Sequence, residues 1–140
     1  KDTTLIISAD HGVMDGQGKL NFNQHPKFIE CLSNAICGEP RVAFCYVKPD
    51  KTGQFESYVK RKLSKYCSLY KSTDLVKKGY FGLGNLHPKL LERIGDYTLI
   101  AKKKYIFRDF LVTEKIHFNK GDHGGLSKEE MIVPVILHKL

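Results

Sequence analysis

The most informative feature of this 140-residue sequence at first reading is what it lacks. No stretch holds the roughly 18 consecutive apolar residues that a transmembrane helix requires, so we expect no membrane association. The cysteines Cys31, Cys37, Cys45 and Cys67 form no C-x-x-C pair, which argues against a structural zinc ribbon. There is also no RNA-binding signature, such as an aromatic-rich strand motif or a glycine loop between two helices, so nucleic acid is not an expected partner.

The N-terminus lacks the basic, then apolar, then small-residue pattern of a secretion signal. The chain begins at Lys1 and enters the apolar run at residues 5–7 almost at once. Because a folded protein rarely starts just before a buried strand, we expect a further segment to precede Lys1. Nothing in the cysteine pattern indicates a disulfide framework, so reduced thiols and a cytoplasmic setting are the expectation.

Basic residues outnumber acidic ones, with 23 Lys and Arg, 15 Asp and Glu and a net charge of +8. A basic surface attracts anions in general, including phosphoesters. The lysines are spread over residues 60–62, 77–78 and 102–104 and form no long tail. Each cluster is therefore more simply interpreted as a solvated surface than as a binding site for a polyanion.

Apolar runs and amphipathic segments alternate along the chain. Residues 3–9, 41–48 and 132–137 have the pattern of buried strands, and residues 52–66 and 88–94 that of helices. A helix is also expected from residue 25 to residue 36, a loop over residues 15–27, and a hairpin joining residues 97–101 to 105–107. This alternation predicts an α/β fold with a layered, largely parallel sheet and flanking helices.

The first candidate site lies where the first strand ends, at Asp10-His11-Gly12. Ligands of open α/β sheets bind just beyond the carboxyl ends of strands. A carboxylate oxygen and an imidazole nitrogen suit Zn²⁺ or Mn²⁺. Neighbouring strand residues point to opposite faces, so a bend at Gly12 is needed to turn both side chains toward one ion. The alternative is a turn-capping Asp beside a surface His.

The second candidate site is the glycine-flanked histidine of Gly121-Asp122-His123-Gly124-Gly125, which leads through Ser127 into the last strand. Glycines on both sides leave room for an ion or a substrate to approach the backbone. The same composition also describes an ordinary flexible loop. Ser127 and Glu130 have the spacing of a capping box at a helix start.

Taken in this order, the two sites resemble the alkaline phosphatase superfamily, and within it the type I phosphodiesterase/nucleotide pyrophosphatase-like branch. Residues 121–136 are similar to the closing motif of that branch, and residues 38–42 and 93–97 also resemble its archaeal and bacterial members. The resemblance covers essentially all of the 140 residues but only the last part of the family's usual length. It implies that this chain is the C-terminal part of an alkaline phosphatase-like catalytic domain.

The resemblance also implies roles for three residues. Asp10 and His11 match the pair that binds the metal holding the nucleophile, and His123 matches a ligand of the second metal. Asp122 has no counterpart among the ligands and is interpreted as stabilising its loop or supporting a ligand. The other histidines match no ligand position and are interpreted as surface or capping residues: His25, His87, His117 and His138.

In the family, the Thr or Ser nucleophile and the remaining ligands precede the position of Asp10, and no such segment is present here. We therefore expect a C-terminal fragment, residues 1–140, that supplies part of a two-metal site and is inactive alone. Residues 1–40 and 106–140 would form the metal-site core, and residues 41–105 an inserted α/β subdomain. The expected cofactors are two divalent ions, Zn²⁺ ahead of Mn²⁺.

The expected substrate is a phosphoester or nucleotide-like small molecule, and the expected partner is the N-terminal part of the same protein. Two classes of alternative remain. The same scaffold serves phosphomonoesterases, sulfatases, phosphonate hydrolases and phosphomutases, which differ partly in the nucleophile. The second alternative is that the protein is a non-enzymatic, basic α/β binding module.

Overall fold

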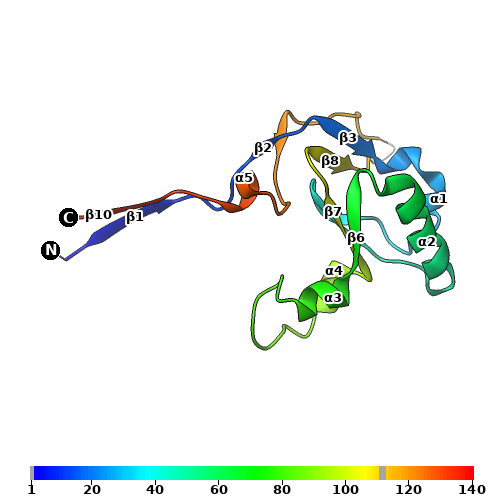
Figure 1. The fold of residues 1–140 in the computed structure, drawn as a ribbon, viewed down its shortest axis with the longest axis horizontal. Helices are drawn as coiled ribbons and strands as arrows, with labels where there is room; N and C mark the ends of the chain where they lie inside the picture. The colour runs from blue at the N-terminus through cyan, green and yellow to red at the C-terminus, as the bar shows by residue number, and fades with distance from the viewer. Residues whose placement is uncertain (1, 111–112) are drawn as a thin grey trace.

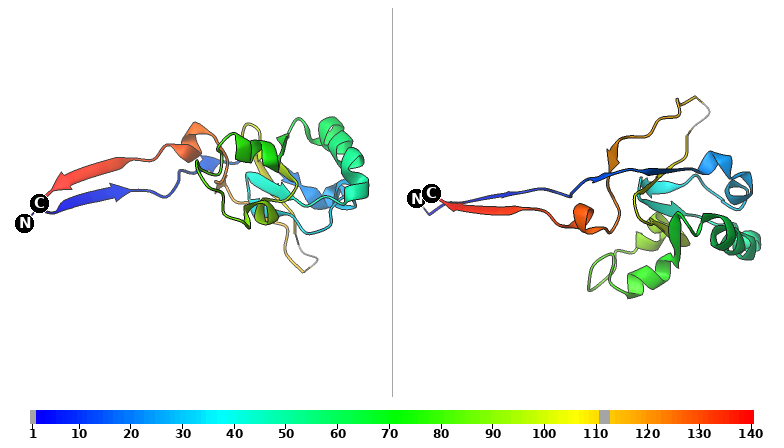
Figure 2. Two further views of the ribbon diagram at one scale, coloured as in Figure 1. Left: turned by 90° about the horizontal axis from the view of Figure 1, so that it is seen from below. Right: turned by 45° about the horizontal axis from the view of Figure 1, so that its top comes forward.

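The computed structural model describes residues 2–110 and 113–140, which form a compact body and a long two-stranded ribbon that projects from it (Figure 1). The ribbon pairs β1 (Thr4–Ser8) antiparallel with β10 (Val135–Lys139). A backbone hydrogen bond of 3.0 Å from Leu140 to Thr3 closes its far end. Segments from the two ends of the chain therefore lie side by side, well away from the body (Figure 2).

The body is built on a four-stranded sheet in the order β4-β5-β7-β6. Its strands are β4 (Cys37–Glu39), β5 (Val42–Cys45), β7 (Tyr97–Ala101) and β6 (Cys67–Lys71), and every neighbouring pair is antiparallel. Side chains on adjacent strand residues point to opposite faces, so this sheet has two distinct surfaces.

One surface of the sheet carries the hydrophobic core. It is covered by α1 (Pro26–Ile29), α2 (Thr52–Tyr58) and the π-helical turn η3 (Val59–Leu63), with single turns at η1 (Phe22–Gln24) and η2 (Pro49–Lys51). Phe28 and Phe55 are fully buried with ring centroids 5.4 Å apart, and Phe22 stacks on Phe28 at 5.0 Å. These rings meet Cys45 and Leu99 of the sheet in one continuous cluster.

The opposite surface of the sheet is covered more thinly, by α3 (Ser72–Lys77) and α4 (Leu90–Ile94). The buried Ser72 hydroxyl lies 2.9 Å from the Thr98 hydroxyl on β7 and donates to the Ile94 carbonyl at 3.0 Å. This small polar contact joins both helices to the sheet. Val42 and Phe44 on β5 remain only half-buried on this side.

Two short strand pairs and one short helix lie between the central sheet and the ribbon. β2 (Met14–Asp15) pairs antiparallel with β9 (Gly121–Asp122), and β3 (Gly18–Asn21) pairs parallel with β8 (Tyr105–Arg108). The short helix α5 (Lys128–Met131) begins with the capping box predicted for Ser127 and Glu130. All four cysteines are free thiols, and no described helix is long and apolar enough to cross a membrane.

The mixed α/β class is confirmed, but the pairing of the strands corrects several expectations. Among the described residues only β3 and β8 pair in parallel, and the other pairings are antiparallel. β7 and β8 do not form the predicted hairpin, because β8 pairs with β3, which lies inside the stretch predicted to be a loop. Lys103 turns the chain between them with φ of 49°.

The predicted helix over residues 25–36 is wrong beyond residue 29. There the chain pairs with the segment after β5, through hydrogen bonds from Ser33 to the Tyr46 carbonyl and from Lys48 to the Cys31 carbonyl. Strands form near both ends of the chain as predicted, but the last one begins at Val135 and not at residue 132, and neither strand is buried. Ile6 is 63% exposed and Val135 65%, since nothing in the described structure packs on either face of the ribbon.

Candidate metal centre

The two histidines predicted from separate motifs lie against each other. The His11 and His123 rings stack with centroids 3.7 Å apart and planes inclined by 15°. His11 follows the end of β1 and His123 follows β9, so the contact joins segments from opposite ends of the chain. The structure thus brings together the two imidazoles that sequence analysis singled out.

The side chain of Asp10 lies beside His11. The Asp10 Oδ2 atom is 3.5 Å from His11 Nε2, and the His11 amide donates to Asp10 Oδ1 at 3.0 Å. Nδ1 of His11 is 2.9 Å from the Gly12 carbonyl, where it can only donate, so this contact leaves the lone pair on Nε2. Two ligand atoms bound to one tetrahedral Zn²⁺ at about 2.0–2.1 Å lie about 3.3 Å apart. The spacing of Oδ2 and Nε2 therefore fits a single ion.

Gly12 contacts α5, the short helix that follows the second motif. Its amide donates to the Glu130 carbonyl of α5 at 2.8 Å. A Cβ atom at position 12 would lie 1.8 Å from the Glu129 carbonyl oxygen, closer than any side chain can approach. Glycine at this position thus permits close backbone contact with α5, a role that differs from the bend predicted from the sequence.

Asp122 anchors the strand from which His123 emerges. Its carboxylate is buried and accepts hydrogen bonds from Asn119 at 3.0 Å and from Arg108 at 3.5 Å. Among the residues that the structure describes, neither the second oxygen, Oδ2, nor Nε of Arg108 has a hydrogen-bond partner. These contacts hold the start of the glycine-rich loop to β8.

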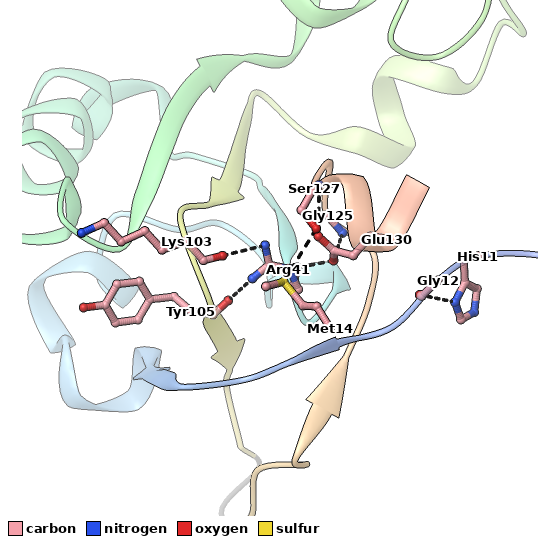
Figure 3. A network of polar contacts seen from close by, with 9 residues as sticks. All are labelled: His11, Gly12, Met14, Arg41, Lys103, Tyr105, Gly125, Ser127 and Glu130. Atoms are coloured by element: carbon pink, nitrogen blue, oxygen red, sulfur yellow. Dashed lines mark hydrogen bonds and ion pairs between the residues drawn. The ribbon is translucent and has the colours of Figure 1, made fainter. Parts of the chain in front are cut away.

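A buried ion pair fixes the remainder of this loop (Figure 3). Arg41 Nε lies 2.6 Å from Glu130 Oε1, and the two side chains are 2% and 1% exposed. Glu130 also accepts from the amides of Gly125 at 2.8 Å and Ser127 at 3.2 Å. The carboxylate is therefore shared between a cation and two backbone donors of the loop.

The other end of Arg41 binds the turn between β7 and β8. Its Nη1 donates to the Tyr105 carbonyl at 2.6 Å, and its Nη2 to the Lys103 carbonyl at 3.0 Å. One guanidinium thus connects the body to the segment that carries His123. Sequence reasoning missed this role. The sequence feature that could have indicated it is an arginine at the start of an apolar strand, because a charge buried there requires a partner.

The Arg41 contact and the two backbone donors set the ionisation of Glu130. Burial by itself raises the pKa of this carboxyl, but the hydrogen bonds from Arg41, Gly125 and Ser127 outweigh burial and leave the pKa below its usual value. Glu130 is thus a charged acceptor at neutral pH, and a charged acceptor makes stronger hydrogen bonds than a neutral one.

The remaining histidines have other partners or lie apart from these two. His25 lies 3.0 Å from the Tyr58 hydroxyl, and burial lowers its pKa. His87 accepts from the Lys89 amide, and His117 lies 3.1 Å from the Lys115 carbonyl. Within residues 2–110 and 113–140, no three His, Cys, Asp or Glu side chains are grouped closely enough to hold a metal ion. Asp10, His11 and His123 are thus close together but do not by themselves form such a group among the described residues.

The fold is shared with solved structures of an ectonucleotide pyrophosphatase/phosphodiesterase and of a phosphonoacetate hydrolase. Human ectonucleotide pyrophosphatase/phosphodiesterase 5 superposes with a TM-score of 0.68 at 16% identity, over 96% of this chain and 33% of that one. The murine protein gives 0.65 at 15% identity, over the same shares. Phosphonoacetate hydrolase from Sinorhizobium meliloti 1021, solved with phosphonoacetate, gives 0.66 at 16% identity, over 96% and 35%.

The chain therefore spans about a third of the length of the solved structures that it matches. No protein-family model and no curated protein sequence matches it. At this level of identity, the structural likeness establishes the fold alone.

Proposed function

We propose that this chain is the C-terminal part of a two-metal hydrolase of phosphoric esters, similar to phosphodiesterases and nucleotide pyrophosphatases. The observation that carries the proposal is the contact between His11 and His123, whose rings stack 3.7 Å apart. Two-metal phosphoesterases hold their ions about 3.5–4 Å apart. Adjacent, nearly parallel imidazoles suit such a site, in which each ring serves a different ion.

In this proposal Asp10 and His11 hold one ion and His123 holds the other. Zn²⁺ is the favoured ion for carboxylate and imidazole donors, with Mn²⁺ as the alternative. When bound, such ions lower the pKa of an attacking hydroxyl and stabilise the leaving oxygen. The chain's own part is to orient the ligands. The Gly12 carbonyl selects the tautomer of His11, and Asp122 with Glu130 fixes the loop beside His123.

The ribbon supports the proposal that a further part of the protein completes the site. Apolar side chains are exposed on both of its faces, which is the pattern of a strand pair buried in the middle of a layered sheet. We therefore assign residues 1–40 and 106–140 to the metal-site core and residues 41–105 to an inserted subdomain. The preceding part would supply the nucleophile and the remaining ligands, so this chain alone is inactive.

The proposed substrate is a phosphoester or nucleotide-like small molecule. Murine ectonucleotide pyrophosphatase/phosphodiesterase 5 has been solved with AMP in an inactive form. The net charge of +8 favours anionic substrates. A phosphonate hydrolase is the second candidate, because phosphonoacetate hydrolase matches this chain equally well in fold.

Replacement of the ligands in the full-length protein tests the proposal. We expect His11→Ala and His123→Ala each to lower bound Zn²⁺, measured by elemental analysis, and to cut turnover of bis(p-nitrophenyl) phosphate at least a hundredfold. His87→Ala, at an exposed position in the loop before α4, is the matched control and should retain both. Full metal content and full activity in both ligand variants would overturn the proposal.

The non-enzymatic alternative predicts a different result in the same preparation. A basic binding module would bind oligonucleotides with steep salt dependence and would be stable without metal. A substrate panel of phosphomonoesters, phosphodiesters, sulfate esters and phosphonates then separates the reactions that share this scaffold.

A further inference from the structure

The central sheet ends at β6, since among the described strands only β7 pairs with it. The two strands are antiparallel, and in such a pair only every second residue exchanges hydrogen bonds with the opposite strand. At one end of β6 the Lys102 amide donates to the Tyr66 carbonyl at 2.8 Å. At the other end the Ser72 amide donates to the Asp96 carbonyl at 3.0 Å. These two contacts fix which residues of β6 bond to β7.

The other residues of β6 direct their backbone groups toward the open side of the sheet. By alternation from the two end contacts, residues 68 and 70 bond to β7, whereas the N–H and C=O groups of Cys67, Leu69 and Lys71 face away from it. In the part of the chain that the structure describes, the amides of Leu69 and Lys71 have no hydrogen-bond partner on this side. A row of unpaired backbone groups is a template for one more strand.

A groove of about 510 Å³ follows the open side of β6. Residues 67–70 of the strand line it together with Val59 and Lys60, which belong to η3, and with Lys102, which follows β7. Figure 1 shows α2, which leads into η3, beside β6. Exposed sheet edges bind extended peptides by strand addition in several recognition domains, where main-chain hydrogen bonds supply the affinity. An extended segment thus finds both unpaired backbone groups and space beside them.

The charges around this groove are almost all of one sign. Residues 57–73 include five Lys or Arg and no Asp or Glu, and residues 102–104 add three lysines. The two basic clusters are far apart in the sequence, but the fold brings Lys60 and Lys102 to the same groove. Glu56 also lines it, and its carboxylate accepts a hydrogen bond from the Tyr97 hydroxyl. Such a surface attracts an anionic partner.

A second copy of this chain matches the groove poorly. Pairing β6 with β6 of another copy would bring two basic surfaces together, and like charges opposite each other across a strand pair are destabilising. Lysines at sheet edges act in general against pairing between copies. An extended segment rich in Asp and Glu has the complementary charge, and its backbone supplies the partners that Leu69 and Lys71 lack.

We propose that the groove beside β6 binds an extended, acidic segment of a partner protein, which adds to the central sheet as a further strand. Backbone hydrogen bonds to Leu69 and Lys71 hold the segment, and Lys60 and Lys102 select carboxylates. The groove is separate from the candidate metal centre, because none of its lining residues belongs to either histidine motif. Loss of peptide binding therefore leaves the proposed hydrolase function untouched.

The first experiment titrates the full-length protein with a short peptide of alternating glutamate and valine, blocked at both ends, in a calorimeter. We expect binding that weakens as added salt screens the charges, and no binding of the same peptide with lysine in place of glutamate. Two further peptides carry N-methyl groups on one or the other set of alternate residues. Since an added strand bonds through every second residue, one set should abolish binding and the other should leave it within about threefold.

The second experiment removes one backbone donor of the protein. Lys71 has φ of −68°, which suits proline, and its N–H faces away from β7, so Lys71→Pro deletes the donor and leaves the sheet paired. Lys71→Ala removes the same side chain, keeps the N–H and is the matched control. We expect Lys71→Pro to bind the glutamate peptide about three- to tenfold more weakly than Lys71→Ala.

A third comparison tests the charge of the groove. We expect Lys60→Glu to weaken binding of the glutamate peptide about tenfold, because it places a carboxylate in the groove lining. Lys77→Glu, at an exposed position of α3 outside the lining, makes the same change in net charge and should stay within about twofold of the parent. Equal weakening in both variants would overturn a site in this groove.

The remaining outcomes are equally decisive. No binding of the glutamate peptide, equal effects of the two methylated peptides, or equal affinities of Lys71→Pro and Lys71→Ala would each overturn strand addition. Circular dichroism identifies a variant that fails to fold, and the methylated peptides then decide the matter, since they need no variant. A dimer that the glutamate peptide does not dissociate, detected by sedimentation, would assign this edge to a second copy and overturn the proposal.

Discussion

Arg41 and Glu130 form a buried ion pair, with Nε and Oε1 2.6 Å apart, between the central body and the helix that supports the His123 loop. Arg41 also donates to two backbone carbonyls of the turn between β7 and β8. Glu130 also accepts from two backbone amides of the glycine-rich loop. The pair thus connects the two candidate ligand motifs to the body through one fixed contact, and several expectations follow from it.

Removal of the arginine should be strongly destabilising. Arg41→Ala leaves the Glu130 carboxylate buried without its cation, and an unpaired buried charge of this kind costs about 3–5 kcal/mol. Urea unfolding of parent and variant measures the change. Glu129→Gln, on the exposed neighbouring residue of α5, is the matched control and should unfold at the parent's midpoint. A loss below about 1 kcal/mol in Arg41→Ala would show that the loop does not depend on the pair.

The lowered pKa of Glu130 predicts acid sensitivity. A carboxyl whose pKa is lower in the folded state than in the unfolded state contributes stability above its unfolded pKa and loses it as pH falls through the folded pKa. The stabilisation should be complete above about pH 4.5 and decline below it. Glu130→Gln should be less stable at pH 7 and show a shallower decline in unfolding free energy with acid, measured by urea titrations from pH 6 to pH 2.5. An unchanged slope would contradict this.

The close approach of Gly12 to α5 predicts a steric effect. In Gly12→Ala the added carbon meets the Glu129 carbonyl oxygen, so α5 or the end of β1 must move, at a cost of about 1–3 kcal/mol. Gly53→Ala is the control, because a Cβ there meets nothing within 4 Å and alanine favours the helix α2. It should raise the free energy of unfolding by about 0.5–1 kcal/mol. Thermal unfolding should then show a lower midpoint than the parent for Gly12→Ala and a higher midpoint for Gly53→Ala.

The apolar ribbon predicts a difference between this chain and the full-length protein. Ile6→Thr keeps a β-branched residue on an exposed strand and should leave the unfolding of the isolated chain unchanged. If the ribbon is buried between layers in the full-length protein, the same substitution should cost about 1–3 kcal/mol there. Leu83→Thr, outside the ribbon, should be neutral in both. Equal effects of Ile6→Thr in the two proteins would argue against burial of the ribbon.

Several elements were predictable because their determinants are local. The helix after Thr52, the strand at residues 97–101 and the capping box at Ser127 and Glu130 depend on apolar spacing and on hydrogen bonds between near neighbours. The segment after residue 29 was mispredicted as helix because its backbone donors and acceptors pair with residues 46–48, a distant partner that periodicity does not reveal.

By itself, the sequence determined the mixed α/β class, the positions of the two histidine motifs and the types of donor that they carry, because each is a property of a short segment. Only the tertiary structure decided that His11 and His123 stack, that strand pairing is mostly antiparallel and that Arg41 reaches Glu130. These relationships join residues far apart in the chain, and they form only when burial and hydrogen bonding are satisfied for all the segments at once.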